Sequence, residues 1–185
     1  MLPLLLGTLI VLSVLLSGMR GAALLWHGGV TASALLAAAW QTPRPVLPCL
    51  AALCVAASIL PLSWGLARLE DDPPRPGERT LCLAGGLACA VLAVVAVPRG
   101  LLDAAGRPAL VAALAAILCG VLAAALRRSV VGQCAGLSAA LDGLTLLAGL
   151  SGRGALLLGV AALQAALMLV AFVCLRRIAW ARGTE

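Results

Sequence analysis

Charged side chains are scarce in this chain, at 11% of the 185 residues, whereas hydrophobic residues make up 63%. A soluble fold of this length could not cover so much apolar surface with so few charges. The apolar runs are continuous and lack the alternation of polar and apolar residues that marks the strands of a membrane barrel. The composition therefore excludes a soluble domain and indicates a helical membrane protein.

Motifs of enzymes and metal sites are also missing. The sequence has no GxSxG, no HExxH, no glycine-rich phosphate loop and no ligand pair for zinc. None of the seven cysteines forms a CxxC pair, and nearly all lie in apolar runs, so we interpret them as core residues. The single histidine, His27, excludes a bis-histidine haem within the chain and is expected to hydrogen-bond a neighbouring helix. We therefore expect no enzyme activity, no cofactor and no metal site.

Long apolar stretches dominate what is present. Crossing about 30 Å of hydrocarbon takes about 20 apolar residues, and most of the stretches reach that length. They predict an all-α, polytopic membrane bundle of about seven transmembrane helices, surrounded by membrane lipid. The stretches are Leu2–Ser17, Ala22–Trp40, Val46–Ala67, Thr80–Val97, Pro108–Leu126, Val130–Leu150 and Ala155–Leu175.

The net charge of +6 comes from thirteen arginines, because the chain has no lysine. We interpret it as a signal of membrane orientation and not of nucleic acid binding. Nine arginines fall on one side of the predicted membrane and four on the other, which predicts a cytoplasmic C-terminus and an external N-terminus. The richer side holds Arg20, Arg68, Arg75, Arg79, Arg127, Arg128, Arg176, Arg177 and Arg182, and the poorer side holds Arg44, Arg99, Arg107 and Arg153.

Helix breakers and charges divide the chain into three parts. Residues 1–78 form a three-helix unit that ends in a cytoplasmic loop, 79–106 a connecting helix with an external loop, and 107–185 a second three-helix unit. Pro61 lies deep in the third apolar stretch and should kink that helix. The spacing of polar and glycine positions allows the two three-helix units to be parallel copies, although low-complexity Ala/Leu sequence produces such matches by chance.

The sixth apolar stretch carries small residues at the spacing of close helix packing, namely Gly132, Gly136 and Gly143. In lipid, small residues allow helix backbones to approach one another. This stretch is therefore predicted to be surrounded by other helices and shielded from lipid.

Asp142 is the only acidic residue inside a predicted span, where a charge costs about 2.5–3.5 kcal/mol on insertion scales. Ser138 and Thr145 lie four residues before and three after it, on the same helical face. Gln164 is the corresponding polar residue of the last stretch, at a similar expected depth. Two interpretations stay open. These residues form part of a proton path, or they make interhelical hydrogen bonds worth about 0.6–2 kcal/mol each.

Residues 107–177 resemble the small three-helix subunit K of NADH–quinone oxidoreductase (complex I). The resemblance is carried by the run Arg127-Arg128-Ser129-Val130-Val131-Gly132-Gln133-Cys134-Ala135-Gly136-Leu137-Ser138. In that family an Arg pair at a cytoplasmic turn leads into a helix with Gly-Leu-Glu. With its additional N-terminal helices, the chain is similar to hydrogenase-4 component E, whose Met-Glu-Asn-Gly signature falls on Ala140-Leu141-Asp142-Gly143.

The chain departs from both families at the acidic positions. The glutamates of these families fall on Ser138, Leu141 and Gln164, and a lysine of component E falls on Ala56. The resemblance implies a non-catalytic membrane subunit of a complex I-like respiratory or group 4 hydrogenase/formate hydrogenlyase-type complex. Its partners would be a large antiporter-like membrane subunit and other subunits of that complex, and its role would be a structural bridge with at most a partial part in proton translocation.

Two other functions remain alternatives at this stage. One is a small self-contained membrane transporter, which would need a midplane site with broken helices and several polar groups. The other is a membrane assembly factor with no transport role. Co-purification with a large antiporter-like protein would distinguish the subunit from both.

Overall fold

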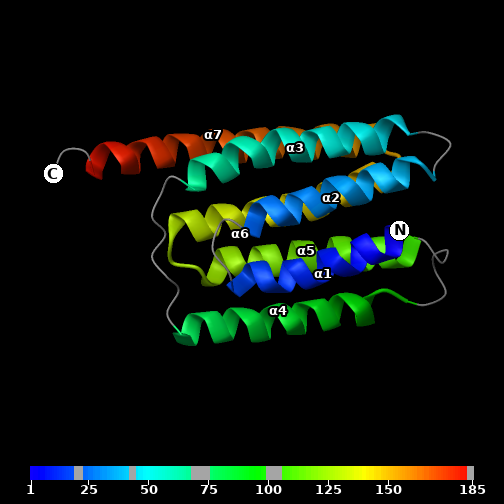
Figure 1. Cartoon of the computed structure of the whole chain (residues 1–185), viewed down its shortest axis with the longest axis horizontal. Coiled ribbons are helices and arrows are strands. Elements are labelled where there is room, and N and C mark those ends of the chain that lie inside the picture. Colours follow the sequence, from blue (N-terminus) through cyan, green and yellow to red (C-terminus); the bar gives the residue numbers. More distant parts are fainter. Residues whose placement is uncertain (19–22, 42–44, 68–75, 99–105, 183–185) are drawn as a thin grey trace.

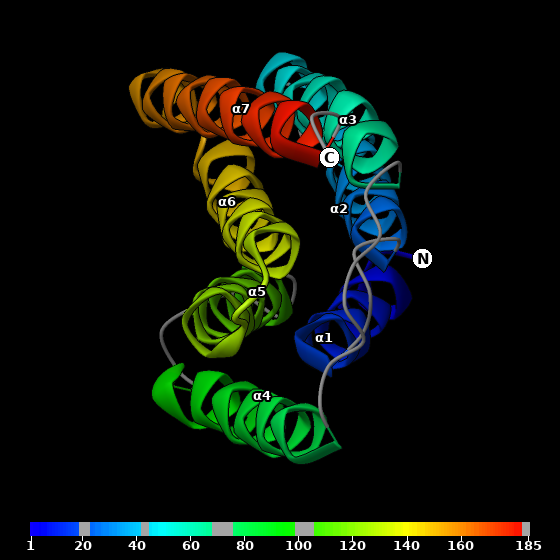
Figure 2. The same ribbon diagram turned by 90° about the vertical axis from the view of Figure 1, so that its left-hand side faces the viewer.

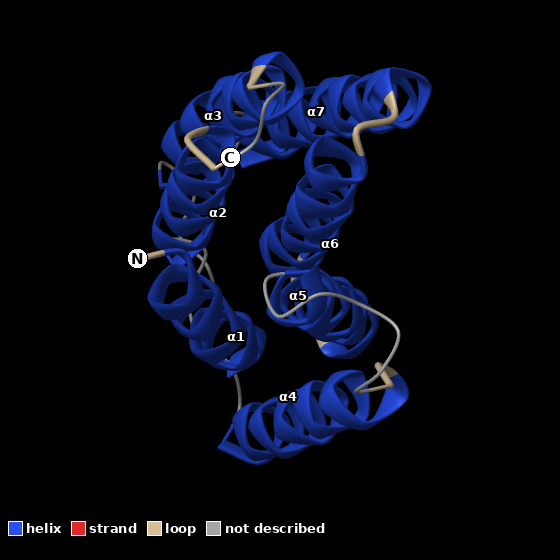
Figure 3. Cartoon of the chain, turned by 90° about the vertical axis from the view of Figure 1, so that its right-hand side faces the viewer, coloured by secondary structure: helices blue, strands red, loops and turns tan. Residues whose placement is uncertain are grey.

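The computed structural model describes residues 1–18, 23–41, 45–67, 76–98 and 106–182. Over these ranges the chain forms seven α-helices and no strand (Figures 1 and 3). The helices are α1 (Leu2–Gly18), α2 (Ala23–Ala39), α3 (Val46–Ala67), α4 (Pro76–Ala96), α5 (Gly106–Leu126), α6 (Val130–Ser151) and α7 (Gly154–Arg182).

Successive helices run in opposite directions, so that α1, α3, α5 and α7 point one way and α2, α4 and α6 the other (Figure 1). The helices α1, α2 and α3 form one row and α5, α6 and α7 a second. The rows face each other with α1 against α5, α2 against α6 and α3 against both α6 and α7 (Figure 2). Helix α4 packs across α1 and α5. This is the order that two parallel copies joined by α4 would produce.

Five helices are long and apolar enough to cross a membrane. These candidate spans are Val46–Ser63, Gly77–Ala96, Gly106–Leu126, Val130–Ser151 and Gly154–Cys174. Helices α1 and α2 contain the shorter apolar stretches Leu2–Leu15 and Leu24–Ala39. The predicted all-α membrane bundle agrees with this architecture.

Helix α6 occupies the centre of the bundle. In its candidate span 72% of the residues are buried, compared with 22% in the spans of the outer helices α4 and α7. Its first turn is closed by Ser129, whose hydroxyl oxygen accepts a hydrogen bond from the backbone N–H of Gly132 at 3.0 Å. Its end is marked by Gly152, which has a positive φ of 69° that glycine adopts without strain. Local sequence therefore defines both ends of the most buried helix.

The backbones of helices α5 and α6 are in direct contact. A Cβ added at Gly136 of α6 would lie 2.7 Å from the carbonyl oxygen of Gly120 on α5, and one added at Gly120 would lie 2.6 Å from the carbonyl oxygen of Gly136. One added at Gly143 would lie 2.7 Å from the carbonyl oxygen of Ala113. Gly132 has a different position, because its neighbours are Ser129 and Arg127 in the turn that precedes α6.

Two further sequence expectations concern prolines. Pro61 lies inside α3, which continues unbroken on both sides of it, and its side chain is exposed. The polar segment that was expected to form a loop up to Arg79 is partly helical, because α4 already begins at Pro76. Proline is well tolerated in the first turn of a helix, where the missing N–H has no partner to lose. The expected boundary between 78 and 79 therefore falls inside the first turn of α4, and the preceding 68–75 lie outside the described residues.

Candidate functional site

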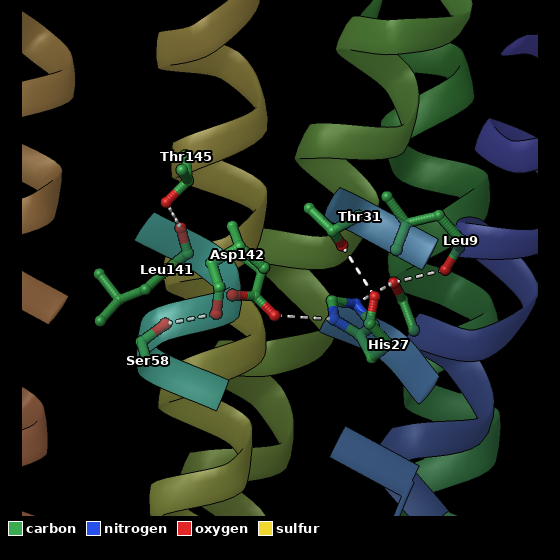
Figure 4. Close-up of polar contacts among 9 residues, drawn as sticks. Leu9, His27, Thr31, Ser58, Leu141, Asp142 and Thr145 are labelled. Carbon is green, nitrogen blue, oxygen red and sulfur yellow. Dashed lines mark hydrogen bonds and ion pairs between the residues drawn. The ribbon is translucent and has the colours of Figure 1, made fainter. Parts of the chain in front are cut away.

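A histidine and an aspartate meet in the interior of the bundle (Figure 4). His27 Nδ1 of α2 lies 3.1 Å from Asp142 Oδ2 of α6, and the two side chains are 0% and 1% exposed. The expectation that His27 hydrogen-bonds a neighbouring helix is confirmed, and its partner on α6 is the one acidic residue of the predicted spans. The histidine thus gives Asp142 a titratable partner from the facing row of helices.

A serine on a third helix extends the pair. Ser13 Oγ of α1 lies 3.1 Å from His27 Nε2 and donates its own hydrogen to the carbonyl oxygen of Leu9 at 2.7 Å. A hydroxyl group has one hydrogen, and its shorter contact is to Leu9, so we assign Ser13 as the acceptor and the proton of this contact to His27 Nε2. The polar line runs sideways through the bundle, from α1 through α2 to α6.

This tautomer determines what lies between His27 and Asp142. Neutral histidine protonated at Nε2 has an acceptor at Nδ1, so its bond to Asp142 requires a protonated carboxyl group that donates. The alternative is an imidazolium that donates from Nδ1 to an ionised carboxylate. In both cases one proton lies between the two side chains and the pair has no net charge. A neutral pair avoids most of the cost of placing an isolated charge in a low-dielectric interior.

The backbone around the pair allows the helices to come close enough. A Cβ at Gly28, next to His27, would collide with the end of the Ile59 side chain on α3, so glycine leaves room there for that side chain. Gly143, next to Asp142, has the same role between α6 and α5. Thr31 donates its hydroxyl to the carbonyl oxygen of His27 at 2.9 Å, within its own helix.

The carboxyl group has a second oxygen that is turned away from the histidine (Figure 4). Asp142 Oδ1 is buried and has no hydrogen-bond partner within the described residues. The pair therefore has one bonded side and one unbonded side. Chemically, the arrangement can hold a proton and exchange it with a donor or acceptor that reaches Oδ1.

The other predicted site residues lie near Asp142 but have different surroundings. Thr145 donates its hydroxyl to the carbonyl oxygen of Leu141 at 2.8 Å, a bond within α6 that leaves the pair untouched. Ser138 and Gln164 line a common cavity between α3, α6 and α7. The structure thus joins Asp142 to His27, places Ser138 and Gln164 at one cavity without a hydrogen bond between them, and leaves Thr145 bonded within its own helix.

The two arginines of the predicted cytoplasmic turn also differ from each other. Arg128 is exposed, whereas Arg127 is 4% exposed and its side chain interacts with the thiol of Cys82 on α4. Arg127 also offers its carbonyl oxygen to the side-chain amide of Gln133 at 3.0 Å. It therefore ties the turn between α5 and α6 to the beginning of α4.

No group of three or more His, Cys, Asp or Glu side chains that could hold a metal ion occurs in the described ranges. The cysteines are free thiols spread over α3 to α7. Within these ranges the chemistry of the site rests on the histidine, the aspartate and nearby hydroxyl and amide groups.

The sequence predicted a hydrogen bond from His27 to a neighbouring helix but not its partner. His27 and Asp142 are the two imidazole or carboxylate side chains inside the predicted apolar stretches, and a titratable group buried there needs a partner. The two residues are 115 positions apart in the sequence, so no local pattern indicated that they are in contact. Comparison with known proteins adds nothing further, because neither a scan against protein-family models nor searches of curated proteins and solved structures found a match to this chain.

Proposed function

We propose that this chain is a non-catalytic integral membrane subunit of a complex I-like respiratory or group 4 hydrogenase/formate hydrogenlyase-type complex. In this proposal it bridges the membrane arm next to a large antiporter-like subunit, and its pair of His27 and Asp142 holds a proton that is exchanged with groups supplied by its neighbours. The observation that carries the proposal is the 3.1 Å contact between His27 Nδ1 and Asp142 Oδ2 at the centre of an apolar bundle.

The topology of the proposal uses all seven helices as membrane spans. Helices α1 and α2 have 17 residues each, which corresponds to a length of about 25 Å. A span slightly shorter than the hydrocarbon layer is accommodated by local thinning of the bilayer. The N-terminus is then external, the C-terminus cytoplasmic, and residues 107–185 form the unit similar to subunit K in a bacterial inner membrane.

The geometry favours proton exchange over a purely structural contact for two reasons. A contact that only fixed packing would use up its polar atoms, but Asp142 Oδ1 keeps free capacity for a hydrogen bond. The pair also includes two titratable groups, so that a proton can move between them without creating net charge in the interior. A bundle with a single carboxyl group would lack the second property.

The first experiment tests the assembly. The tagged full-length chain is purified from its native membrane in a mild detergent, and its partners are identified by mass spectrometry. The proposal expects a stoichiometric complex that contains a large multi-helix antiporter-like protein. A lone chain or an oligomer of this chain with transport activity of its own would contradict it.

The second experiment tests the proton. In the assembled complex, Asp142→Asn is expected to leave the subunit composition intact and to lower the number of protons moved per electron. Glu78→Gln is the matched control, since it makes the same acid-to-amide change at the first turn of α4. If Asp142→Asn leaves the proton-to-electron ratio unchanged, the pair is only structural.

A further inference from the structure

A small cavity lies beside the central helix, between α3, α6 and α7. It has a volume of about 10 Å³, which is room for about one water molecule. Most of its wall is apolar, but one polar side chain from each of the three helices reaches it. The lining residues are Ser58, Ile59, Leu62, Ser138, Leu141, Gln164, Leu167 and Met168.

Gln164 is the unusual member of this wall. Its side chain is 5% exposed, and neither Oε1 nor Nε2 has a hydrogen-bond partner among the described residues. A primary amide offers two donor hydrogens and an oxygen acceptor with two lone pairs. Each polar group left unpaired in the interior costs about 1–3 kcal/mol, so a glutamine with two such groups is expected to have a ligand.

The two serines supply complementary groups. Ser58 donates its hydroxyl hydrogen to the carbonyl oxygen of Val55 at 2.9 Å, which leaves the lone pairs of its oxygen able to accept (Figure 4). Ser138 is 7% exposed and presents a hydroxyl group from α6. The cavity therefore combines acceptors and donors from three different helices.

We propose that this cavity is a specific site for one water molecule, which bridges Gln164 on α7 to Ser138 on α6 and Ser58 on α3. The volume limits the ligand to the size of water. None of the eight lining residues is an acid or a base, so the ligand is neutral and is not a metal cation or an anion. The water has the two to four polar partners that buried waters in proteins have.

The site has a consequence for proton exchange that rests on the proposed function. Ser138 lies about one helical turn before Asp142 on the same face of α6, so one partner of the water lies on the helix face that carries the carboxyl group. Asp142 is not among the residues that line the cavity, so a proton would need a further group to pass between the carboxyl group and the water. The hydration site itself does not require that function.

The test uses the full chain in lipid nanodiscs and hydroxyl radicals produced from water by a short X-ray pulse. Such radicals label side chains next to bound water, and Met168 lines the cavity. We expect Met168 to be labelled in the unsubstituted chain and its labelling to fall several-fold in Gln164→Leu. Gln133→Leu is the matched control, because it is the same glutamine-to-leucine change at an exposed residue that does not line the cavity. It should leave the labelling of Met168 unchanged.

A second measurement needs no substitution. In the unsubstituted chain, magnetisation should transfer from water to the side-chain amide hydrogens of Gln164 in NMR. Transfer that is absent at Gln164, or Met168 labelling that persists in Gln164→Leu, would overturn the proposal. Neither outcome depends on proton movement, so failure here is separate from failure of the proposed function, which Asp142→Asn tests.

Discussion

His27 and Asp142 are separated by 115 residues of sequence, yet His27 Nδ1 lies 3.1 Å from Asp142 Oδ2. The contact joins the middle helices of the two rows, because α2 lies between α1 and α3 and α6 lies between α5 and α7. It pairs a basic with an acidic side chain, both fully buried, within a largely apolar interface between the two rows.

Replacing one member of this pair should lower the free energy of unfolding by more than the loss of its packing contacts alone. His27→Leu leaves a buried carboxyl group without its partner, and Asp142→Leu leaves a buried imidazole, whereas the double variant removes both problems. The double variant should therefore be destabilised by less than the sum of the two single variants. We expect an interaction energy of about 0.6–1.7 kcal/mol, the range found for polar contacts between membrane helices, measured from unfolding in mixed detergent.

The control for this cycle is Ser33→Ala combined with Asp142→Leu. Ser33 lies on the same helix as His27, is exposed, and donates only to the carbonyl oxygen of Gly29 at 2.7 Å. Its effect and that of Asp142→Leu should add. Additive effects of His27→Leu and Asp142→Leu would show that the two side chains are not coupled.

The protonation of His27 can be measured directly, because the chain has one histidine and gives one set of imidazole signals. With ¹⁵N-labelled histidine, NMR should show a proton on Nε2, as the Ser13 contact requires. In Ser13→Ala this preference should weaken, since Nε2 loses its acceptor. An unsubstituted chain with a bare Nε2 and a protonated Nδ1 would contradict the hydrogen-bond assignment.

The helical architecture could be predicted from sequence because it depends on local composition. Apolar runs bounded by arginine, proline and glycine place most helices within a few residues of their observed ends, as in Val130–Leu150 for α6 (Val130–Ser151), but α7 continues to Arg182, beyond the predicted end at Leu175. The beginning of α4 was placed too late, since the charges after Pro76 were interpreted as a loop although they form the first helical turn. Periodicity and composition do not define where a polar first turn begins.

The site could be predicted only in part. Asp142 was identified because a carboxyl group is exceptional in an apolar helix, and this is a local property. Its contact with His27 depends on the packing of α2 against α6, which no pattern within either helix specifies. Gly132 also shows that spacing within one helix does not predict a contact between helices. Its spacing matched Gly136, but it lies in the turn near Arg127 and not against a neighbouring helix.

The approach of α5 and α6 makes Gly136 sensitive to the smallest enlargement. In Gly136→Ala the new Cβ would lie 2.6 Å from the backbone nitrogen of Ala124 and 2.7 Å from the carbonyl oxygen of Gly120, so one helix must shift. Overpacking of this kind costs about 1–3 kcal/mol, which we expect as a loss of unfolding free energy in detergent. Gly29→Ala on α2 is the matched control, because nothing lies within 4 Å of its added Cβ. A Gly136→Ala variant as stable as Gly29→Ala would contradict the close contact.

The N-terminal cap of α6 should stabilise the first turn of that helix. Ser129 has extended backbone angles, with φ −77° and ψ 136°, and accepts from the N–H of Gly132 at 3.0 Å. Ser129→Ala removes this acceptor and should reduce the unfolding free energy by about 0.5–2 kcal/mol. Hydrogen exchange should also accelerate at the Gly132 amide. Ser33→Ala, in the middle of α2, makes the same substitution without a cap and should change both quantities little. Unchanged exchange at Gly132 in Ser129→Ala would mean that the turn before α6 is held by other contacts, such as the Arg127 carbonyl with Gln133.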